Sequence, residues 1–335
     1  MSGDMLKKLD WSSETVLVTG AGGFIGSQLV ESLLEKGARV RAFVRYNSRN
    51  DLGFLNDLCS DDRLAVVAGD IRDLDTVRKV AEGVDVIFHL AALVGIPYSY
   101  QHVHQVVEVN TNGTLNVLTA GRENGVKRLV HTSTSEVYGT ARTVPISEEH
   151  PKQPQSPYSA SKIAADALAL SFHLSFGLPV TVCRPFNTYG PRQSDRAIIP
   201  TLISQALSMD ELVLGSLTPT RDFTYVTDTV NGFLRVAESE LCVGEEVNLG
   251  TGQEISIGDL ASRVIELIGR DVKVRQSAER MRPTGSEVQR LCSNNSKAKR
   301  LASWSPSVSL DDGLRSTVAW VQSSSHLYDP QHYRI

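Results

Sequence analysis

Short hydrophobic stretches alternate with amphipathic segments along the first part of the chain. Segments such as 74–82 and 110–124 carry hydrophobic residues at helical spacing and separate the hydrophobic stretches. Strands that alternate with helices form a parallel sheet with helices on both faces. The pattern therefore predicts an α/β fold with a doubly wound parallel sheet. The predicted strands are "TVLVTG" (15–20), "ARVRAFV" (38–44), "LAVVAGD" (64–70), "VDVIFHLAA" (84–92) and "VKRLVHTST" (126–134).

The regular alternation ends after a proline-rich loop at 151–157, a long predicted helix at 158–176 and a buried strand at 178–186. Beyond that strand, segments marked by Pro and Gly, such as "TYGPRQ" and "RMRPTGSEV", predict a smaller, irregular lobe that forms a cleft with the edge of the sheet. The predicted division is a sheet domain over 1–185, to which 223–250 returns, and a second lobe over 186–222 and 251–330.

A glycine-rich turn, "GAGGFIG", follows the first predicted strand and opens the first helix. Its glycines are Gly20, Gly23 and Gly26. Glycine permits the tight turn, lets the backbone approach a pyrophosphate and allows close contact between helix and strand. The free N–H groups at the N-terminus of the helix favour the negative phosphates. In the first βα unit of an alternating chain, this turn predicts a Rossmann-type dinucleotide-binding domain.

The end of the second predicted strand bears on the choice between NAD and NADP. NAD-specific folds usually place an acid there to bind the ribose hydroxyls, whereas this chain has Val44 and then Arg45. An arginine at this point can pair with a 2′-phosphate, which favours NADP. Alternatively, Arg45 and Arg49 are simply exposed and NAD binds without the carboxylate. Asp70, after the third strand, is a candidate partner for the adenine edge.

Tyr158 and Lys162, in "YSASK", are four residues apart and share one face of the predicted helix. A lysine ammonium near a phenol stabilises the phenolate and lowers the pKa of the tyrosine. The phenolate can then accept the proton of a substrate hydroxyl as a hydride leaves carbon. Thr134, at the hydroxyl-rich end of the fifth strand, would hydrogen-bond the same substrate oxygen.

These features together resemble the extended short-chain dehydrogenase/reductases that act on nucleotide sugars. The resemblance covers almost the full chain and is carried by "VTGAGGFIG", "GDIRD", "FHLAA", "VNTNGTLNVL", "TSTSEVYG", "SPYSASK", "RPFNTYGPR" and "RDFTYVTD". It implies that Thr134, Tyr158 and Lys162 are the catalytic threonine, tyrosine and lysine. It also implies that NAD or NADP stays tightly bound and is regenerated in each turnover.

The same resemblance implies which residues bind the cofactor and the nucleotide sugar. Arg282 lies in "RPTGSEV", which departs from the commoner "RPGD" form, and the alternative role of Arg221 and Arg282 is an ion pair within the protein. The implied cofactor-binding residues are Gly20, Gly23, Phe24, Ile25, Gly26, Arg45, Asp70, Ile71, Leu90, Ala91, Ala92, Tyr158 and Lys162. The implied substrate-binding residues are Ser135 and, for the diphosphate, Asn187, Arg221 and Arg282.

Glu136 narrows the choice of reaction. In the 4,6-dehydratases of this family a carboxylate stands two residues after the catalytic hydroxyl, and Thr134-Ser135-Glu136 has the pattern of the GDP-mannose type. One carboxylate near C5 and C6 of the sugar can take the C5 proton and deliver it to the leaving C6 hydroxyl. Three alternatives stay open: a UDP-glucuronate decarboxylase, which shares "TSEVYG"; a 4-epimerase of the same family; and a Glu136 that only caps a helix or pairs with an arginine.

Longer segments, such as "VRAFVRYNSRND" and "LGSLTPTRDFTYVTDTVNGF", are most similar to the retaining 4,6-dehydratases of legionaminic acid pathways. This similarity implies UDP-N-acetylglucosamine, or its GDP counterpart, as substrate and a 4-keto-6-deoxy sugar as product. Resemblance also implies a homodimer formed through the helices at 110–124 and 158–176. The non-enzyme alternative is a redox-sensing protein, but such proteins usually lack the tyrosine–lysine pair that this chain retains.

Composition and charge exclude several other classes of function. The 335 residues carry a formal charge of −4 and give a pI of about 6.1, which does not favour binding to nucleic acid or to an anionic membrane. The four cysteines are far apart and have no zinc-ligand spacing, which predicts free thiols and no metal site. The sequence shows no signal-peptide pattern or membrane-spanning stretch, so we expect a cytoplasmic protein.

Overall fold

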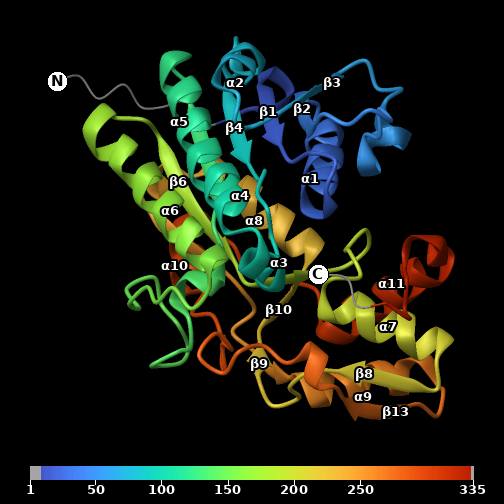
Figure 1. Ribbon diagram of the computed structural model, residues 1–335. Coiled ribbons are helices and arrows are strands. Elements are labelled where there is room, and N and C mark those ends of the chain that lie inside the picture. The colour runs from blue at the N-terminus through green and yellow to red at the C-terminus, as the bar shows by residue number, and fades with distance from the viewer. Residues whose placement is uncertain (1–8, 333–335) are drawn as a thin grey trace.

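A seven-stranded sheet lies at the centre of the computed structural model, which describes residues 9–332 (Figure 1). Its order is β11-β6-β5-β4-β1-β2-β3, and every neighbouring pair runs parallel. The predicted parallel sheet is therefore confirmed. The strands are β1 (Thr15–Thr19), β2 (Arg39–Arg45), β3 (Leu64–Gly69), β4 (Val86–His89), β5 (Arg128–Thr132), β6 (Val180–Pro185) and β11 (Glu246–Leu249).

Helices cover both faces of the sheet, because successive strand residues point to opposite sides. In β1, Val16 and Val18 belong to the hydrophobic core on one face, whereas Leu17 belongs to the core on the other. This double burial explains why the strands read as continuous hydrophobic runs in the sequence. The first face carries α1 (Phe24–Glu35), α8 (Val226–Glu238) and α10 (Ser296–Ala302), and the second carries α2 (Leu74–Ala81), α5 (Gly113–Glu123) and α6 (Pro157–Phe176).

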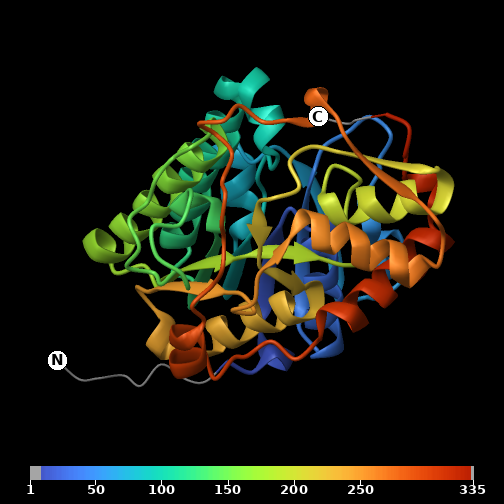
Figure 2. The same cartoon turned by 90° about the horizontal axis from the view of Figure 1, so that it is seen from below.

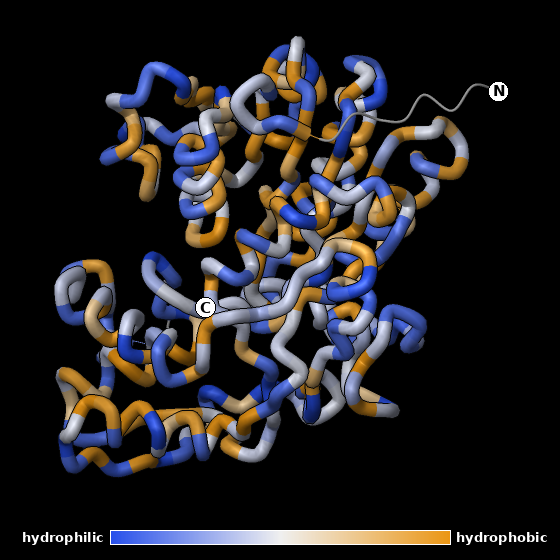
Figure 3. Tube along the Cα trace, turned by 180° about the vertical axis from the view of Figure 1, so that it is seen from behind, coloured by the Kyte–Doolittle hydropathy of each residue, from blue (hydrophilic) through white to orange (hydrophobic). Residues whose placement is uncertain are grey.

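A smaller lobe with a hydrophobic core of its own lies next to the end of the sheet toward which the strands run (Figures 1 and 2). Leu202, Leu212 and Leu260 are fully buried in this core. Hydrophobic and hydrophilic segments alternate along its helices, as expected for helices with one buried face (Figure 3). The elements of the lobe are α7 (Ile198–Ser208), β8 (Glu211–Leu214), α9 (Ile257–Ile268), β13 (Lys273–Gln276) and α11 (Leu310–Ser323).

One helix of the C-terminal part packs with the sheet and not with this lobe. Ala298 and Ala302 of α10 are buried in the same core as α1 and α8, together with Trp304. The sequence-based division assigned this helix to the second lobe, within 251–330, and the boundaries of the two parts stay a prediction. Among the described residues, no helix is both long enough and apolar enough to cross a membrane.

Short elements connect these parts. The short helices are α3 (Ile96–Gln101), α4 (Val103–Val107) and a π-helical turn, η3 (Glu108–Asn112). The short strands are β7 (Asn187–Tyr189), β9 (Thr220–Arg221), β10 (Phe223–Tyr225) and β12 (Ile255–Ser256). The 3₁₀ turns are η1 (Trp11–Ser13), η2 (Gly53–Leu58), η4 (Ser135–Tyr138), η5 (Glu240–Cys242), η6 (Ala278–Arg280) and η7 (Ser325–Leu327).

The fourth strand is shorter than the hydrophobic run 84–92 that predicted it. It ends at His89. The backbone N–H of Leu90 donates to both the carbonyl oxygen and Oγ1 of Thr19, and the N–H of Ala91 donates to Oγ1 of Thr19. The side chain of Asn110, from η3, accepts from the N–H of Leu93 at 2.7 Å and donates to its carbonyl at 3.0 Å. These side-chain hydrogen bonds take the chain out of the sheet once it passes the fourth strand.

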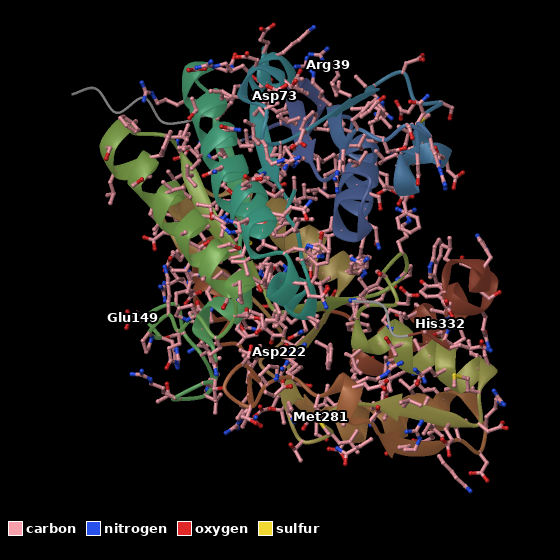
Figure 4. All side chains as sticks on the ribbon, in the orientation of Figure 1. Arg39, Asp73, Glu149, Asp222, Met281 and His332 are labelled. Carbon is pink, nitrogen blue, oxygen red and sulfur yellow. The ribbon has the colours of Figure 1, made fainter. Side chains whose placement is uncertain are left out.

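Asp222 holds together the loops between the sheet and the smaller lobe (Figure 4). Its carboxylate is fully buried. It accepts hydrogen bonds from the backbone N–H groups of Thr251 at 2.8 Å, Gly252 at 2.9 Å and Ser293 at 3.0 Å. Burial of this charge raises the pKa of Asp222, and the hydrogen bonds oppose that shift. The Asp222 side chain therefore fixes two segments, the turn after β11 and the segment at 293, to the short strands β9 and β10 on either side of it.

We predict that Asp222→Ala lowers the free energy of unfolding by about 2–4 kcal/mol, because several buried N–H groups lose their acceptor. Asp222→Asn keeps one carbonyl oxygen and should lose less. Asp75→Ala is the control, since the side chain of Asp75 is 93% exposed and its loss should change stability by no more than about 0.5 kcal/mol. Urea unfolding followed by circular dichroism measures all three. Equal stability of Asp222→Ala and the control would contradict this role.

Candidate active site

A cavity of about 850 Å³ lies at the end of the sheet toward which the parallel strands run. This is the edge where α/β folds bind their ligands. Of the residues that the sequence singled out, Arg221 does not line the cavity. The predicted residues that do line it are Gly20, Gly23, Phe24, Ile25, Gly26, Arg45, Asp70, Ile71, Leu90, Ala91, Ala92, Thr134, Ser135, Glu136, Tyr158, Lys162, Asn187 and Arg282.

The glycine-rich turn forms one wall of the cavity and fits a pyrophosphate. Gly20 has a φ of +70°, and a Cβ atom on Gly26 would lie 2.3 Å from the carbonyl oxygen of Gly20. A side chain at either position would therefore open the turn. Gly23 is the N-cap of α1, and no side chain caps this end of the helix. The N–H groups of the first helical turn stay available for an anionic ligand, as a dinucleotide requires.

Charged side chains lie where β2 and β3 end. Arg45 is exposed and lines the cavity. Asp70 forms an ion pair of 2.6 Å with Arg72, which also lines the cavity and was not singled out from the sequence. The Arg72 guanidinium holds the pKa of Asp70 below its usual value, with a smaller contribution from Arg45. This end of the cavity thus offers two guanidinium groups and a paired carboxylate.

The hydroxyl-rich end of β5 leads into the cavity through a cap. The side-chain oxygen of Thr134 caps η4 by accepting from the N–H of Glu136 at 3.2 Å. Ser133 points the other way, and its hydroxyl donates to the buried carboxylate of Asp166 at 2.8 Å. The neighbouring hydroxyls therefore serve different partners, and the cap places Thr134, Ser135 and Glu136 together on the cavity wall.

Tyr158 and Lys162 lie on the first turns of α6, which begins with a strong N-terminal signal. Ser156 and Ser159 form a capping box, and Pro157 occupies the first helical position. Because the start of the helix is fixed, the side chains of its first two turns point in a fixed direction. The side chains of Tyr158 and Lys162 are 6% and 2% exposed and both line the cavity.

Burial dominates the electrostatics of this pair. It raises the pKa of Tyr158 above its ordinary value, the hydrogen bond with Thr134 opposes this, and the negative charges of Glu136 and Asp166 add to the rise. Burial also lowers the pKa of the Lys162 ammonium to about 8, which the charge of Asp166 opposes. The sequence predicted a lowered tyrosine pKa. In the protein alone, desolvation of the phenolate outweighs the effect expected from Lys162.

Asn187 and the two predicted arginines lie on the side of the smaller lobe. Among the described residues, the buried side-chain oxygen of Asn187 has no hydrogen-bond donor. Arg221 and Arg282 both pair with Glu287, at 3.3 and 3.5 Å. Both arginines thus make the ion pair that the sequence left open as their alternative role. Burial lowers the pKa of Arg221, and the charge of Glu136 is the largest influence that opposes this.

Several polar residues of the cavity wall were not singled out from the sequence. They come from the turn after β3, from α4 and from the loop after β7, whose residues carry no local signal that distinguishes a ligand contact from a structural one. The sequence signal nearest to these residues was at 189–193, which covers the end of the motif "RPFNTYGPR" and the residue after it. These lining residues are Arg72, Gln105, Gln193, Ser194 and Arg196.

Comparison with known proteins agrees with this geometry. The sequence model of the family described as GDP-mannose 4,6 dehydratase matches residues 17–317. A dTDP-glucose 4,6-dehydratase of Streptomyces griseus is 34% identical over 325 residues, covering 94% of this chain and 96% of that protein. A UDP-N-acetyl-alpha-D-glucosaminuronate decarboxylase of Bacillus cytotoxicus is 33% identical over 316 residues, covering 91% of this chain and 96% of that protein.

A solved structure extends the similarity to three dimensions. The UDP-glucuronic acid 4-epimerase of Bacillus cereus, in complex with UDP-glucuronic acid and NAD, matches with a TM-score of 0.86 and 30% identity. The match covers 92% of this chain and 99% of that one. The names of these relatives share a nucleotide-sugar substrate and differ in the reaction. The chain therefore belongs to the GDP-mannose 4,6-dehydratase family of extended short-chain dehydrogenase/reductases, which are NAD-dependent enzymes of nucleotide sugars.

Proposed function

We propose that this protein is a nucleotide-sugar 4,6-dehydratase that converts UDP-N-acetylglucosamine to its 4-keto-6-deoxy derivative. The observation that carries this proposal is the position of Glu136. Its carboxylate lies on the cavity wall with Thr134 and Tyr158, and its charge acts on Tyr158 and Arg221. An oxidation or epimerisation at C4 alone needs no such carboxylate, whereas elimination of water across C5 and C6 does.

The structure argues against a purely structural role for Glu136. The cap of η4 is Thr134, and in the described part of the chain the Glu136 carboxylate makes neither a hydrogen bond nor an ion pair. Arg221, on which its charge acts, is paired with Glu287 instead. A half-buried carboxylate without a partner on a cavity wall is available for a substrate.

The proposed reaction begins with proton transfer by the helix pair. Tyr158 takes the proton of the C4 hydroxyl, Thr134 hydrogen-bonds the same oxygen, and Lys162 stabilises the phenolate. NAD or NADP, when bound, would supply the hydride acceptor and donor. Oxidation at C4 acidifies the C5 proton, which Glu136 removes and delivers to the C6 hydroxyl as it leaves as water. Hydride return to C6, together with return to C5 of a proton equivalent to the one that Tyr158 took from the C4 hydroxyl, would complete a cycle without net oxidation.

The choice of cofactor is part of the proposal. The glycine-rich turn and the free N-terminus of α1 fit the pyrophosphate of either nucleotide. The NAD in the solved epimerase structure supports NAD. Arg45 and Arg72 on the cavity wall would also accept a 2′-phosphate, so these two side chains keep NADP as the alternative.

Incubation of the purified protein with UDP-N-acetylglucosamine should give a product lighter by one water, with no net change in reduced nicotinamide. UDP-glucuronate and UDP-glucose serve as the competing substrates, and mass spectrometry of the mixture is the measurement. Loss of carbon dioxide from UDP-glucuronate would establish a decarboxylase, the type of reaction in the name of one relative. Inversion at C4, which NMR of the product detects because the mass does not change, would establish an epimerase.

Glu136→Gln should abolish water loss by more than about 100-fold, because the amide cannot accept the C5 proton. Hydride transfer should remain visible as reduced-nicotinamide absorbance after substrate is added. Tyr158→Phe is the matched comparison, since it should lose both steps. Dehydration at the wild-type rate in Glu136→Gln would remove Glu136 from the mechanism.

Exposed hydrophobic side chains support the proposed homodimer. Leu174 and Phe176 of α6 and Leu115 of α5 are exposed, Leu174 by 82%. These two helices pack against each other on the same face of the sheet. We expect light scattering to give the mass of a dimer at micromolar concentration and Leu174→Glu to shift it toward the monomer. A monomeric wild-type protein would contradict this assembly.

A further inference from the structure

A buried carboxylate, Asp166, lies beneath the proposed active site on the same helix as Tyr158 and Lys162. It is fully buried. Residues 158, 162 and 166 follow one another at four-residue spacing, so they share one face of α6. The carboxylate accepts from the Ser133 hydroxyl at 2.8 Å and from Nη2 of Arg184 at 2.9 Å. The reaction proposed above makes no use of Asp166.

The positive charge that faces Asp166 is shared with another acid. Arg184 also pairs with Glu246, which in turn pairs with Lys152. Arg184 thus lies between two carboxylates, and its charge acts on Glu246 as well as on Asp166.

Two histidines and a tyrosine around Asp166 carry no charge at neutral pH. His131, 3.3 Å from Asp166, is kept neutral because burial lowers its pKa to about 4. The ring of His89 packs against that of His131, and burial also lowers its pKa. Burial raises the pKa of Tyr138, which hydrogen-bonds Arg184, to about 12. Farther along the network, burial likewise raises the pKa of Glu148.

Lys162 therefore has one nearby negative charge. It is 2% exposed, and among the described residues no carboxylate lies within ion-pair distance of its ammonium. Burial alone would favour the neutral amine, and Asp166 on the next helical turn is the group that opposes this. A neutral lysine could not stabilise the phenolate of Tyr158.

We propose that Asp166 is a positioning residue whose buried charge keeps Lys162 protonated and so extends activity to alkaline pH. The inference rests on the proposed C4 oxidation, a step that dehydratases, decarboxylases and 4-epimerases share, and it does not depend on which of these reactions follows. Ser133 and Arg184 hold the carboxylate in place, and His131 contributes no opposing charge.

Asp166→Asn tests this proposal, because the amide keeps an oxygen for Ser133 and Arg184 but loses the charge. The measurement is the pH profile of reduced-nicotinamide formation by the holoenzyme with its nucleotide-sugar substrate. We expect the alkaline limb, where Lys162 loses its proton, to move to lower pH by about one unit or more. The pKa of Tyr158 should also fall, because the charge of Asp166 adds to its rise, but by less since Tyr158 lies two turns away. Asp166→Glu should restore the alkaline limb.

Ser133→Ala is the matched control, since it removes a hydrogen bond from Asp166 without removing charge, and its alkaline limb should stay at the wild-type pH. Glu246→Gln is a second variant for the case that Asp166→Asn does not fold. Without the charge of Glu246, Arg184 pairs only with Asp166. The alkaline limb should therefore move to lower pH, but by less than in Asp166→Asn. An alkaline limb that stays in place in both charge variants while the rate merely falls would overturn the proposal.

A direct titration separates this inference from the proposed function. In the holoenzyme labelled with ¹³C-lysine, the Cε resonance of Lys162 is identified by its loss in Lys162→Arg. Its midpoint should fall in Asp166→Asn and in Glu246→Gln, even if no nucleotide sugar is turned over. An unchanged midpoint in both variants would contradict the role of Asp166, whereas failed turnover with a shifted midpoint would contradict only the proposed function.

Discussion

The parallel alignment of the strands is the constraint on which the rest of this molecule depends. Because all strands of the large sheet point the same way, the residues that follow β1 to β6 meet at one edge. Helices must then cover both faces, which buries every central strand and leaves that edge as the place where polar side chains can face a ligand. The smaller lobe, with its own hydrophobic core, lies beside this edge. The parallel alignment therefore determines both where the helices lie and where the site forms.

Within the site, burial and charge act against each other. Tyr158 and Lys162 are placed by a capped helix start where solvent hardly reaches them, and desolvation moves both pKa values toward the uncharged forms. Chemistry that uses a phenolate beside an ammonium must offset this cost by nearby charges and hydrogen bonds. The hydrogen bond with Thr134 opposes the shift of Tyr158, and the charge of Asp166 opposes that of Lys162 while adding to that of Tyr158. The buried network below α6 thus belongs with the site as much as the cavity wall does.

Periodicity predicted the sheet and its helices because each strand is buried on both faces and each helix on one. Motif spacing placed most of the predicted residues on a single cavity wall, since residues at strand ends converge in a parallel sheet. What escaped prediction depends on partners distant in sequence. Asp166 reads as one polar residue in a hydrophobic helix until Ser133 and Arg184 are seen to hold it. Likewise, no local pattern shows that Arg221 pairs with Glu287, far along the chain.

The carboxylate shared by Arg221 and Arg282 has a consequence for how the late loop is held to the short strands. Glu287 carries one negative charge and pairs with two guanidinium groups that would otherwise repel each other. Arg221 comes from β9, whereas Arg282 and Glu287 come from the segment between η6 and α10. Loss of Glu287 would therefore leave two like charges side by side and would loosen this segment where it meets β9.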